Sequence, residues 1–173
     1  MAHKYSHIST GGGFSVKNGS TLTEVIPQTG LIPTGSLNPN TVQYIEKSLT
    51  AAQIIALFTT SIEVIPAVAG KIIVLDSFIF DLTGTATQFT GGGVVNLQYG
   101  TTINGAGTTL HADIAATVVS GATARTITRR VPTDLSSTAL AVAVGTSVCI
   151  GAKSAVFAAG TGTAICKVSY HLV

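Results

Sequence analysis

Charge is what this sequence has least of. Asp, Glu, Lys and Arg make up 9% of its 173 residues, whereas an ordinary soluble domain has about 25%. Hydrophobic residues make up 46%. A soluble chain with so little charge has too few polar groups to keep its whole surface in water, so part of that surface must be covered. We therefore expect the chain to pack against copies of itself or against a partner.

A membrane-spanning segment is the other explanation for this composition, and the uncharged run 135–152 is the place to look for one. From residue 140 onward, large and small residues alternate with a period of two, as they do in a strand with distinct faces. The run also lacks the Leu-rich block and the flanking aromatics of a span. The first 13 residues contain no apolar core of a secretion signal. The sequence therefore predicts no membrane partner.

Cysteine is also scarce, and tryptophan is absent. The two cysteines, Cys149 and Cys166, are too few and too far apart for a disulfide framework or a metal site. We expect them to act as small apolar residues in neighbouring strands, which is compatible with a chain made in a reducing cytoplasm. The net charge of +2 is too small to indicate a nucleic-acid partner.

The seven acidic residues do not suggest a catalytic pair. Asp76 and Asp81 fall in one predicted strand at an odd separation, which would point them to opposite faces. Paired-carboxylate catalysis needs both carboxylates in one cleft. We expect Asp81 to be a turn residue at a strand end, and Asp76 to be a buried or interface partner of a Lys or an Arg.

His111 and Asp113 share one face of a strand or loop, so they are the other residues to weigh for catalysis. A Ser-His-Asp site also needs a nucleophile, and no G-x-S-x-G elbow is present. Two ligands are too few for a metal site, and the glycine runs 11–13 and 91–93 lack the rest of a phosphate-binding loop. We predict a non-enzymatic chain with no catalytic residue, cofactor or metal, and a His111 at the surface or on a trimer axis.

Residues 1–47 differ from the rest, because they carry a glycine run and three prolines without any sustained period. We interpret them as an extended N-terminal arm. Its short apolar pieces, Val25 with Ile26 and Leu31 with Ile32, could dock in grooves of a neighbouring subunit. A loose tail fits this composition equally well.

Regular structure is predicted from residue 48 onward. Thr50 and Gln53 form a capping-box pattern in front of a short apolar helix over 51–57. Many short strands in so few residues are typical of a two-sheet sandwich. Residues 48–173 are therefore predicted to form a jelly-roll-like β-sandwich, an all-β fold with one short helix. The expected strands cover 62–65, 71–82, 93–99, 114–119, 125–131, part of 140–150, and a final hairpin of 154–159 and 164–173.

The predicted strand 71–82 is unusual because both of its faces are apolar. Both faces must then be covered, one by the opposite sheet and the other by the arm or by another subunit. The period of two assigns its large residues to the faces as follows: Ile72, Val74, Phe78 and Phe80 on one, and Ile73, Leu75 and Ile79 on the other.

The stretch from Leu49 to Leu57, L-T-A-A-Q-I-I-A-L, is followed by Thr59-Thr60, by V-I-P at 64–66 and by A-G-K at 69–71. This order resembles a recurring opening of small structural proteins of tailed bacteriophages, in which a short helix leads into a strand, a turn and a long apolar strand. The closing I-C-K-V-S-Y at 165–170, after a glycine–threonine turn, is also similar. The resemblance covers residues 48–100 and the final hairpin, and does not include the arm.

This chain departs from the resembling pattern in two places. Ser61 stands where a proline is frequent, and the turn 66–70 lacks a second proline. The resemblance implies a virion structural protein, commonly a capsid decoration (cement) protein or a head or tail accessory protein, and often a trimer. Its partners would be itself, as a homotrimer, and the phage major capsid protein, with assembly into the virion in the host cytoplasm. Such a motif identifies the class of particle better than the position within it.

Arg125, Arg129 and Arg130 are the densest charge in the chain. They would lie on a solvated strand edge, where charge discourages edge-to-edge pairing. Alternatively, they would contact acidic groups on a capsid surface or a sister subunit, which is the interpretation we favour. No aromatic residues alternate with them, as single-stranded nucleic acid would require.

Together these patterns favour a decoration protein that stabilises a phage head through subunit contacts. The alternative is a receptor-binding or tail-fibre domain that recognises host-surface glycan, although aromatic residues for stacking on sugars make up only 6%. A hydrolase built on a jelly roll is a third hypothesis, and it lacks a converging set of catalytic groups.

Overall fold

The computed structural model describes residues 14–18, 21–26, 41–132 and 144–173. Two compact units make up the chain, Met1–Thr41 and Val42–Val173. In the first unit, β1 (Phe14–Asn18) pairs antiparallel with β2 (Thr21–Ile26). The segment predicted to be an extended arm therefore contains a hairpin.

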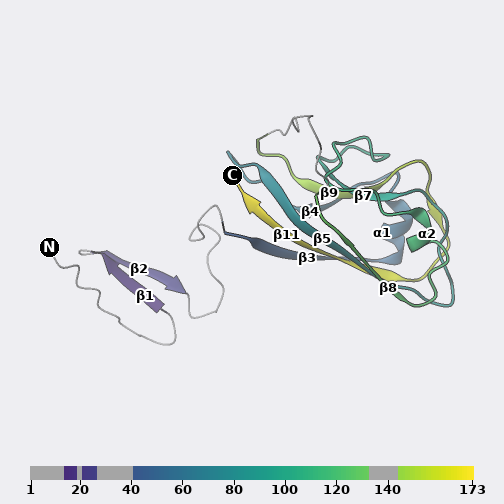
Figure 1. The fold of residues 1–173 in the computed structure, drawn as a ribbon, viewed down its shortest axis with the longest axis horizontal. Coiled ribbons are helices and arrows are strands. Elements are labelled where there is room, and N and C mark those ends of the chain that lie inside the picture. The colour runs from purple at the N-terminus through teal and green to yellow at the C-terminus, as the bar shows by residue number, and fades with distance from the viewer. Residues whose placement is uncertain (1–13, 19–20, 27–40, 133–143) are drawn as a thin grey trace. The chain divides into compact units, whose positions relative to one another are not determined.

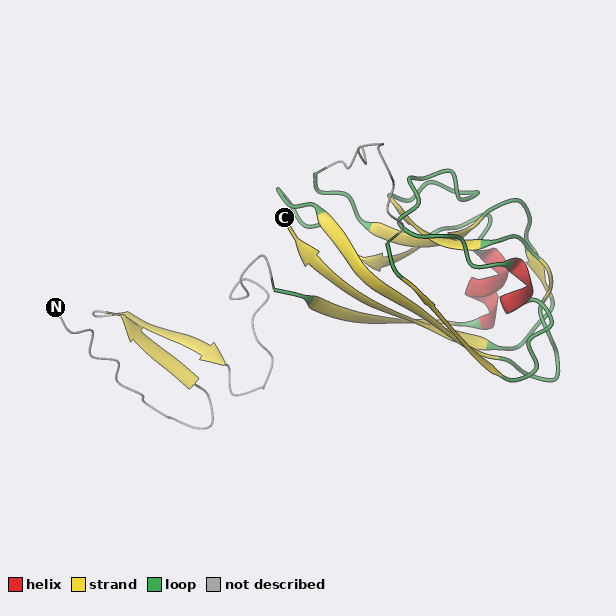
Figure 2. Ribbon diagram, viewed as in Figure 1, coloured by secondary structure: helices red, strands yellow, loops and turns green. Residues whose placement is uncertain are grey.

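The second unit is an all-β sandwich, as predicted, and its first sheet has four antiparallel strands (Figures 1 and 2). In spatial order they are β3 (Gln43–Leu49), β11 (Thr163–Leu172), β5 (Ile73–Thr83) and β8 (Arg125–Arg130). The predicted end of the arm at residue 47 falls inside β3. That strand was missed because its inward side chains are mostly polar or half-buried, so it lacks an apolar stripe.

The second sheet contains β4 (Ile62–Ile65), β9 (Val148–Ala152) and β7 (Val95–Tyr99), in that order. Residues 108–114 continue it beyond β7 through backbone hydrogen bonds such as Val95 N–H to the Ile114 carbonyl at 2.9 Å. A separate pair is formed by β6 (Thr90–Gly91) and β10 (Phe157–Ala158).

The strand pairs are nested along the chain. The first strand of the sandwich, β3, pairs with the last, β11, and β4 pairs with β9. Further in, β5 pairs with β8, and β7 pairs with residues 108–114. The chain is thus arranged like one long hairpin, and the two halves of this hairpin pass together from one sheet to the other.

The predicted capping box is confirmed. The Thr50 hydroxyl accepts from the Gln53 amide at 3.3 Å, and the Gln53 side chain accepts from the Thr50 amide at 2.9 Å. These bonds satisfy two amides at the start of α1 (Ala51–Ala56), which buries Ile54 in the core.

Two of the predicted strands are wrong. Most of 114–119 forms a short helix, α2 (Ala116–Val119), which buries Val119 and overrides the β-propensity of its valines. The predicted final hairpin of 154–159 and 164–173 does not form either. Only Phe157 and Ala158 of its first arm are in a strand, and they pair with β6, while β11 lies between β3 and β5.

A bulge in β5 corrects the predicted faces of that strand. The register with β11 shifts after Ser169, so that Ser77 is opposite Ser169 but Leu75 is opposite Tyr170, and Asp76 is skipped. Because Asp76 is skipped, residues 73 and 75 point to the same face as residues 78, 80 and 82, although an odd number of positions separates 75 from 78. The large inward residues of β5 are therefore on one face, and all are at most 4% exposed: Ile73, Leu75, Phe78, Phe80 and Leu82.

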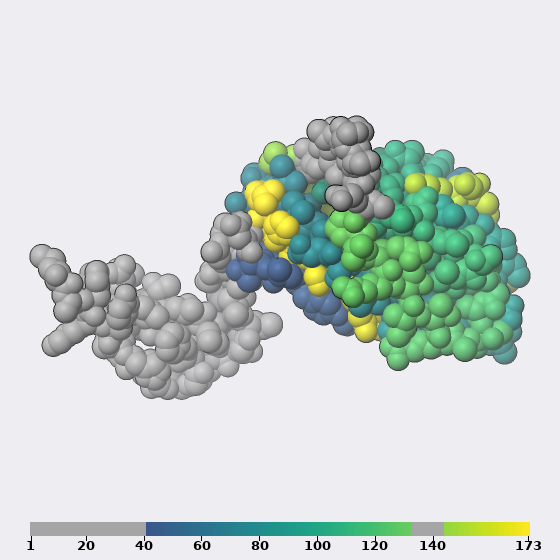
Figure 3. All heavy atoms as spheres, in the orientation of Figure 1, coloured from purple at the N-terminus to yellow at the C-terminus, as the bar shows by residue number. Residues whose placement is uncertain are grey.

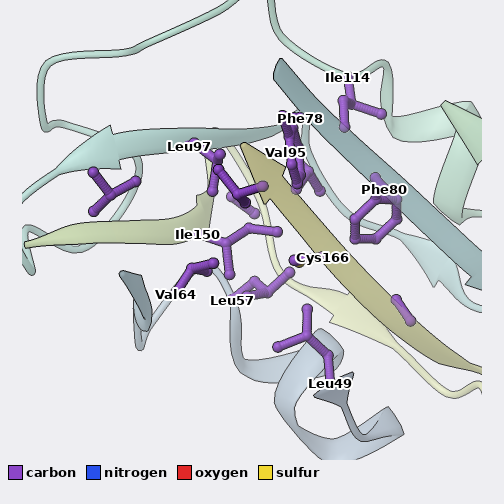
Figure 4. Close-up of a cluster of buried hydrophobic side chains, with 14 of the residues drawn as sticks. Leu49, Leu57, Val64, Phe78, Phe80, Val95, Leu97, Ile114, Ile150 and Cys166 are labelled. Atoms are coloured by element: carbon purple, nitrogen blue, oxygen red, sulfur yellow. The ribbon is translucent and has the colours of Figure 1, made fainter. Parts of the chain in front are cut away.

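The core lies between the two sheets (Figure 4). Phe78 and Phe80 of the first sheet face Leu97 and Ile150 of the second. Each fully buried side chain of this size contributes about 1.5 to 3 kcal/mol relative to exposure. None of the helices in the described residues has the length and apolar character needed to cross a membrane.

Both cysteines are buried free thiols, which confirms their expected role as small core residues. They do not lie in neighbouring strands, because Cys149 belongs to β9 of the second sheet and Cys166 to β11 of the first. Burial raises the pKa of the Cys166 thiol to about 12, so this group stays protonated and unreactive at neutral pH.

Candidate contact surface

The two sheets differ in what covers the side that points away from the core. Behind the second sheet, Asn96 and Gln98 of β7 are fully buried although they point outward. The segment 100–109 folds over them: Gln98 donates to the Thr102 carbonyl and accepts from the Gly107 amide at 3.2 Å, and Asn96 donates to the Thr109 hydroxyl at 3.0 Å. This sheet is therefore covered by its own chain.

Within the described part of Val42–Val173, no comparable segment is paired over the back of the first sheet. We call this side of β3-β11-β5-β8 the outer face. Among its large residues, Tyr44 is 59% exposed and Ile127 is 58% exposed. Cross-strand register places the following residues on it: Tyr44, Glu46 and Ser48 of β3; Ile165, Lys167, Ser169 and His171 of β11; Ser77, Ile79, Asp81 and Thr83 of β5; and Arg125, Ile127 and Arg129 of β8.

Asp81 is a buried carboxylate held by two cations on this face. Arg125 donates to both of its oxygens, at 2.8 and 2.6 Å, and the Lys167 ammonium lies 3.3 Å away. Only 5% of the Asp81 side chain is exposed, whereas 61% of the Arg125 side chain is. The hydrogen bond from Arg125 is the main cause that lowers the pKa of Asp81 to about 2. The prediction of a strand-end turn residue is therefore wrong, since Asp81 lies within β5 and anchors an ion-pair cluster.

Asp76, predicted to be the partner of a Lys or an Arg, instead contacts a histidine. Its carboxylate lies 3.0 Å from Nδ1 of His171, and both side chains are about one-third exposed. The bulge at Asp76 also removes the predicted opposition of the two aspartates, because His171 and Asp81 both belong to the outer face.

The three candidate arginines have three different environments. Arg125 is committed to Asp81. Arg130 points to the inner side of the sheet, where it donates to the carbonyls of Ala112 and Asp113 at 3.2 and 3.4 Å and so ties β8 to the second sheet. Arg129 remains exposed on the outer face, and its guanidinium makes no hydrogen bond or ion pair with residues 41–132 or 144–173. Figure 3 shows the segment that contains β8 at the molecular surface (green).

Glu46 is the counterpart of Arg129 at the opposite edge of the outer face. It lies directly opposite Lys167 in the register of β3 and β11, but the ammonium of Lys167 turns to Asp81 instead. The carboxylate of Glu46 accepts a hydrogen bond from the Tyr44 hydroxyl. It has no cationic partner within the described residues.

The predicted contact residues of the arm are only partly placed. Val25 and Ile26 lie in β2 of the N-terminal hairpin. Leu31 and Ile32 lie outside the described residues. Their proposed docking therefore stays a prediction.

His111 is buried in the core, so the prediction of a surface or trimer-axis histidine is wrong. It is 1% exposed and stacks on Phe78 with ring centroids 5.0 Å apart. Its Nε2 accepts the Leu97 amide at 3.0 Å, which leaves Nδ1 to donate to the Ala112 carbonyl at 2.7 Å. This role was not predictable from local sequence, because the ring accepts from the amide of Leu97, which is brought beside it only by the fold.

This hydrogen bonding needs the neutral ring. Burial is the main cause that lowers the pKa of His111, and the charges of Arg130 and Lys153 lower it further. The bond to Ala112 and the charge of Asp113 oppose them. His111 and Asp113 consequently do not form a catalytic dyad: Asp113 pairs with Lys153 at 3.0 Å.

No group of three or more His, Cys, Asp or Glu side chains in the described residues is close enough to hold a metal ion. The outer face instead carries exposed apolar side chains beside charges of both signs. Comparisons of the chain with protein-family models, with curated proteins and with solved structures find no match.

Replacing the buried carboxylate by Asp81→Asn should destabilise the protein at pH 7 by about 1 to 2 kcal/mol, because Arg125 and Lys167 lose their shared anion. The pKa of Asp81 is lower in the folded protein than in the unfolded one. The stability that its ionised carboxylate contributes is therefore fully present above about pH 4 and is lost as pH falls towards 2. Urea unfolding at pH 7 and pH 2 measures it. The control Asp113→Asn breaks a more exposed pair and should cost less than about 1 kcal/mol. An equal cost of Asp81→Asn at both pH values would contradict this account.

His111 should also make stability fall as pH falls, but in a higher pH range than Asp81 does. Its folded pKa is depressed, so its contribution is complete above the ordinary value of 6.5 and is lost as pH falls below it. His111→Gln keeps an acceptor for the Leu97 amide but cannot titrate, and its stability should fall less between pH 7 and pH 5 than that of the wild type. His111→Phe leaves the amide unpaired and should cost about 1 to 3 kcal/mol at pH 7. Urea unfolding between pH 5 and pH 7 measures this dependence. If the stability of His111→Gln falls as steeply with pH as that of the wild type, the assignment is refuted.

Proposed function

We propose that this chain is a virion structural protein that acts as a capsid decoration (cement) protein of a tailed bacteriophage. In this proposal it is not an enzyme, and it works as a homotrimer bound to the major capsid protein. The observation that carries the proposal is the uncovered outer face, where Tyr44, Ile127 and Arg129 are exposed in a chain that has little charge elsewhere. Surfaces of this kind serve contacts between proteins.

The nested strand pairs support a jelly roll as the finer description of the sandwich. In a jelly roll, a long hairpin is rolled so that its first strand pairs with its last and each inner strand pairs with its counterpart. The pairs β3 with β11, β4 with β9, β5 with β8, and β7 with residues 108–114 follow this rule. Jelly rolls are frequent in viral capsid proteins and also in lectins.

The N-terminal unit supports a role in attachment. Residues 1–41 form a compact unit of their own, which contains the β1–β2 hairpin. A second binding element on each subunit would let many weak contacts add up over a trimer and a shell. The mechanism is then mechanical, since each contact across a junction between capsomers resists outward pressure.

A receptor-binding or tail-fibre domain that recognises glycan is the alternative. It is favoured by Tyr44, which presents an exposed aromatic ring beside the carboxylate of Glu46. Sugar-binding sites combine such a ring with polar groups. Tyr44→Ala would abolish glycan binding under this alternative and would leave capsid attachment through the N-terminal unit intact.

The copy number of this chain in purified particles tests the proposal directly. A decoration protein should be present at a number comparable with that of the major capsid protein, as measured by quantitative mass spectrometry or gel densitometry. A handful of copies would place the chain in the tail or at a vertex. That outcome would reject decoration in favour of the receptor-binding alternative.

Removal of residues 2–41 should abolish attachment to undecorated particles and leave the sandwich folded, because the two units make separate sets of contacts. Co-sedimentation with particles measures attachment, and the unfolding transition of the truncated chain checks the fold. Deletion up to residue 47 is unsuitable, since it would remove most of β3 and expose β11. Full attachment by the folded, truncated chain would exclude this role of the N-terminal unit.

A further inference from the structure

We propose that the outer face binds a second copy of this chain, with the β8 edge of one copy against the β3 edge of the other. In this contact, Arg129 of one copy pairs with Glu46 of the next. The inference rests on the self-association in the proposed function and names the residues of its contact. It can be tested without a capsid, because one purified chain carries both halves of the contact.

The charges of the outer face indicate this partner. One cross-strand row runs Arg129, Ile79, Lys167, Glu46 from the β8 edge to the β3 edge. Lys167 is drawn to Asp81, so the row ends in a cation at one edge and an anion at the other, and neither has a charged partner within the described residues. The two ends are complementary to each other.

Arg129 and Glu46 do not pair within one chain. Two strands lie between β8 and β3, and at a spacing of about 4.8 Å between neighbouring strands the edges are roughly 14 Å apart. An ion pair requires about 4 Å between nitrogen and oxygen. Two copies placed with the β8 edge of one against the β3 edge of the other would bring these groups together.

Each of these edges also carries an exposed apolar side chain. Ile127 is two residues from Arg129 on β8, and Tyr44 is two residues from Glu46 on β3, so each charge has an exposed apolar neighbour on its own face. In the cross-strand order, Tyr44 lies on one side of the charged row and Ile127 on the other. Bringing the β8 edge of one copy to the β3 edge of another would therefore place each apolar side chain beside the partner's edge strand while it joins the charges, without setting one against the other.

The balance of signs distinguishes a second copy from other partners. An acidic partner would satisfy Arg129 and repel Glu46, and a basic partner would do the reverse. A copy of this chain satisfies both at once, and this self-complementarity is how homo-oligomers close. Two-fold packing gives two equal contacts, whereas head-to-tail packing around a three-fold axis gives one contact per neighbouring pair.

A charge-swap series on the full chain tests the inference. Arg129→Glu and Glu46→Arg should each weaken self-association by about tenfold or more, because each places like charges at the contact. The double variant restores opposite charges and should recover association to within about threefold of the wild type. Glu63→Arg, on the exposed edge strand β4 of the other sheet, is the matched control and should leave association unchanged.

Analytical ultracentrifugation over a range of concentrations gives the dissociation constants and the number of copies, and urea unfolding verifies that each variant is folded. Two copies indicate two-fold packing, and three indicate the head-to-tail arrangement; both support the contact if the double variant recovers. A double variant no better than the single ones overturns the pairing. A wild-type chain that stays monomeric also overturns it, because the outer face would then belong to the capsid protein or to the N-terminal unit.

Discussion

The fold depends on backbone pairing between strands that are far apart in the chain. The first strand of the sandwich, β3, joins its sheet only through the last strand, β11, which lies between β3 and β5. Closing such long loops costs chain entropy before any contact repays it. The apolar inner face of each sheet supplies the compensation, since neither sheet can bury it without the other. The nested order of the pairs then determines which side of each sheet is left for other purposes.

That order leaves the two outer sides in different states. The connection after β7 is long enough to fold back over its own sheet, where it buries Asn96 and Gln98. The first sheet is made of strands whose connections run to the other sheet, so no described segment of the sandwich covers it. Its outer face carries charged side chains instead, and the cluster of Asp81, Arg125 and Lys167 joins β5, β8 and β11.

Local patterns in the sequence predicted the local features of this structure. The capping box at Thr50 and the strands predicted over 93–99 and 164–173 follow from neighbours in the chain, and each was found. The bulge at Asp76 was not predictable, because it is defined by a register shift against β11. The role of His111 depends on the Leu97 amide beside it in another segment. For the candidate surface, the sequence located the arginines but could not separate Arg129 from Arg130, whose faces are set by the pairing of β8 with β5.

Lys167 links the interior of this charge cluster to the contact surface. It has two carboxylates within reach, Glu46 directly across β3 and Asp81 diagonally across β5. Asp81 is almost fully buried, so leaving it short of a cation would cost more than leaving the exposed Glu46 unpaired. Lys167 pairs with Asp81 and adds to the two hydrogen bonds from Arg125. Glu46 is thereby left without a cationic partner in the described residues at the β3 edge. The same buried charge that strengthens the sheet thus also determines which of its surface charges are available to a neighbour.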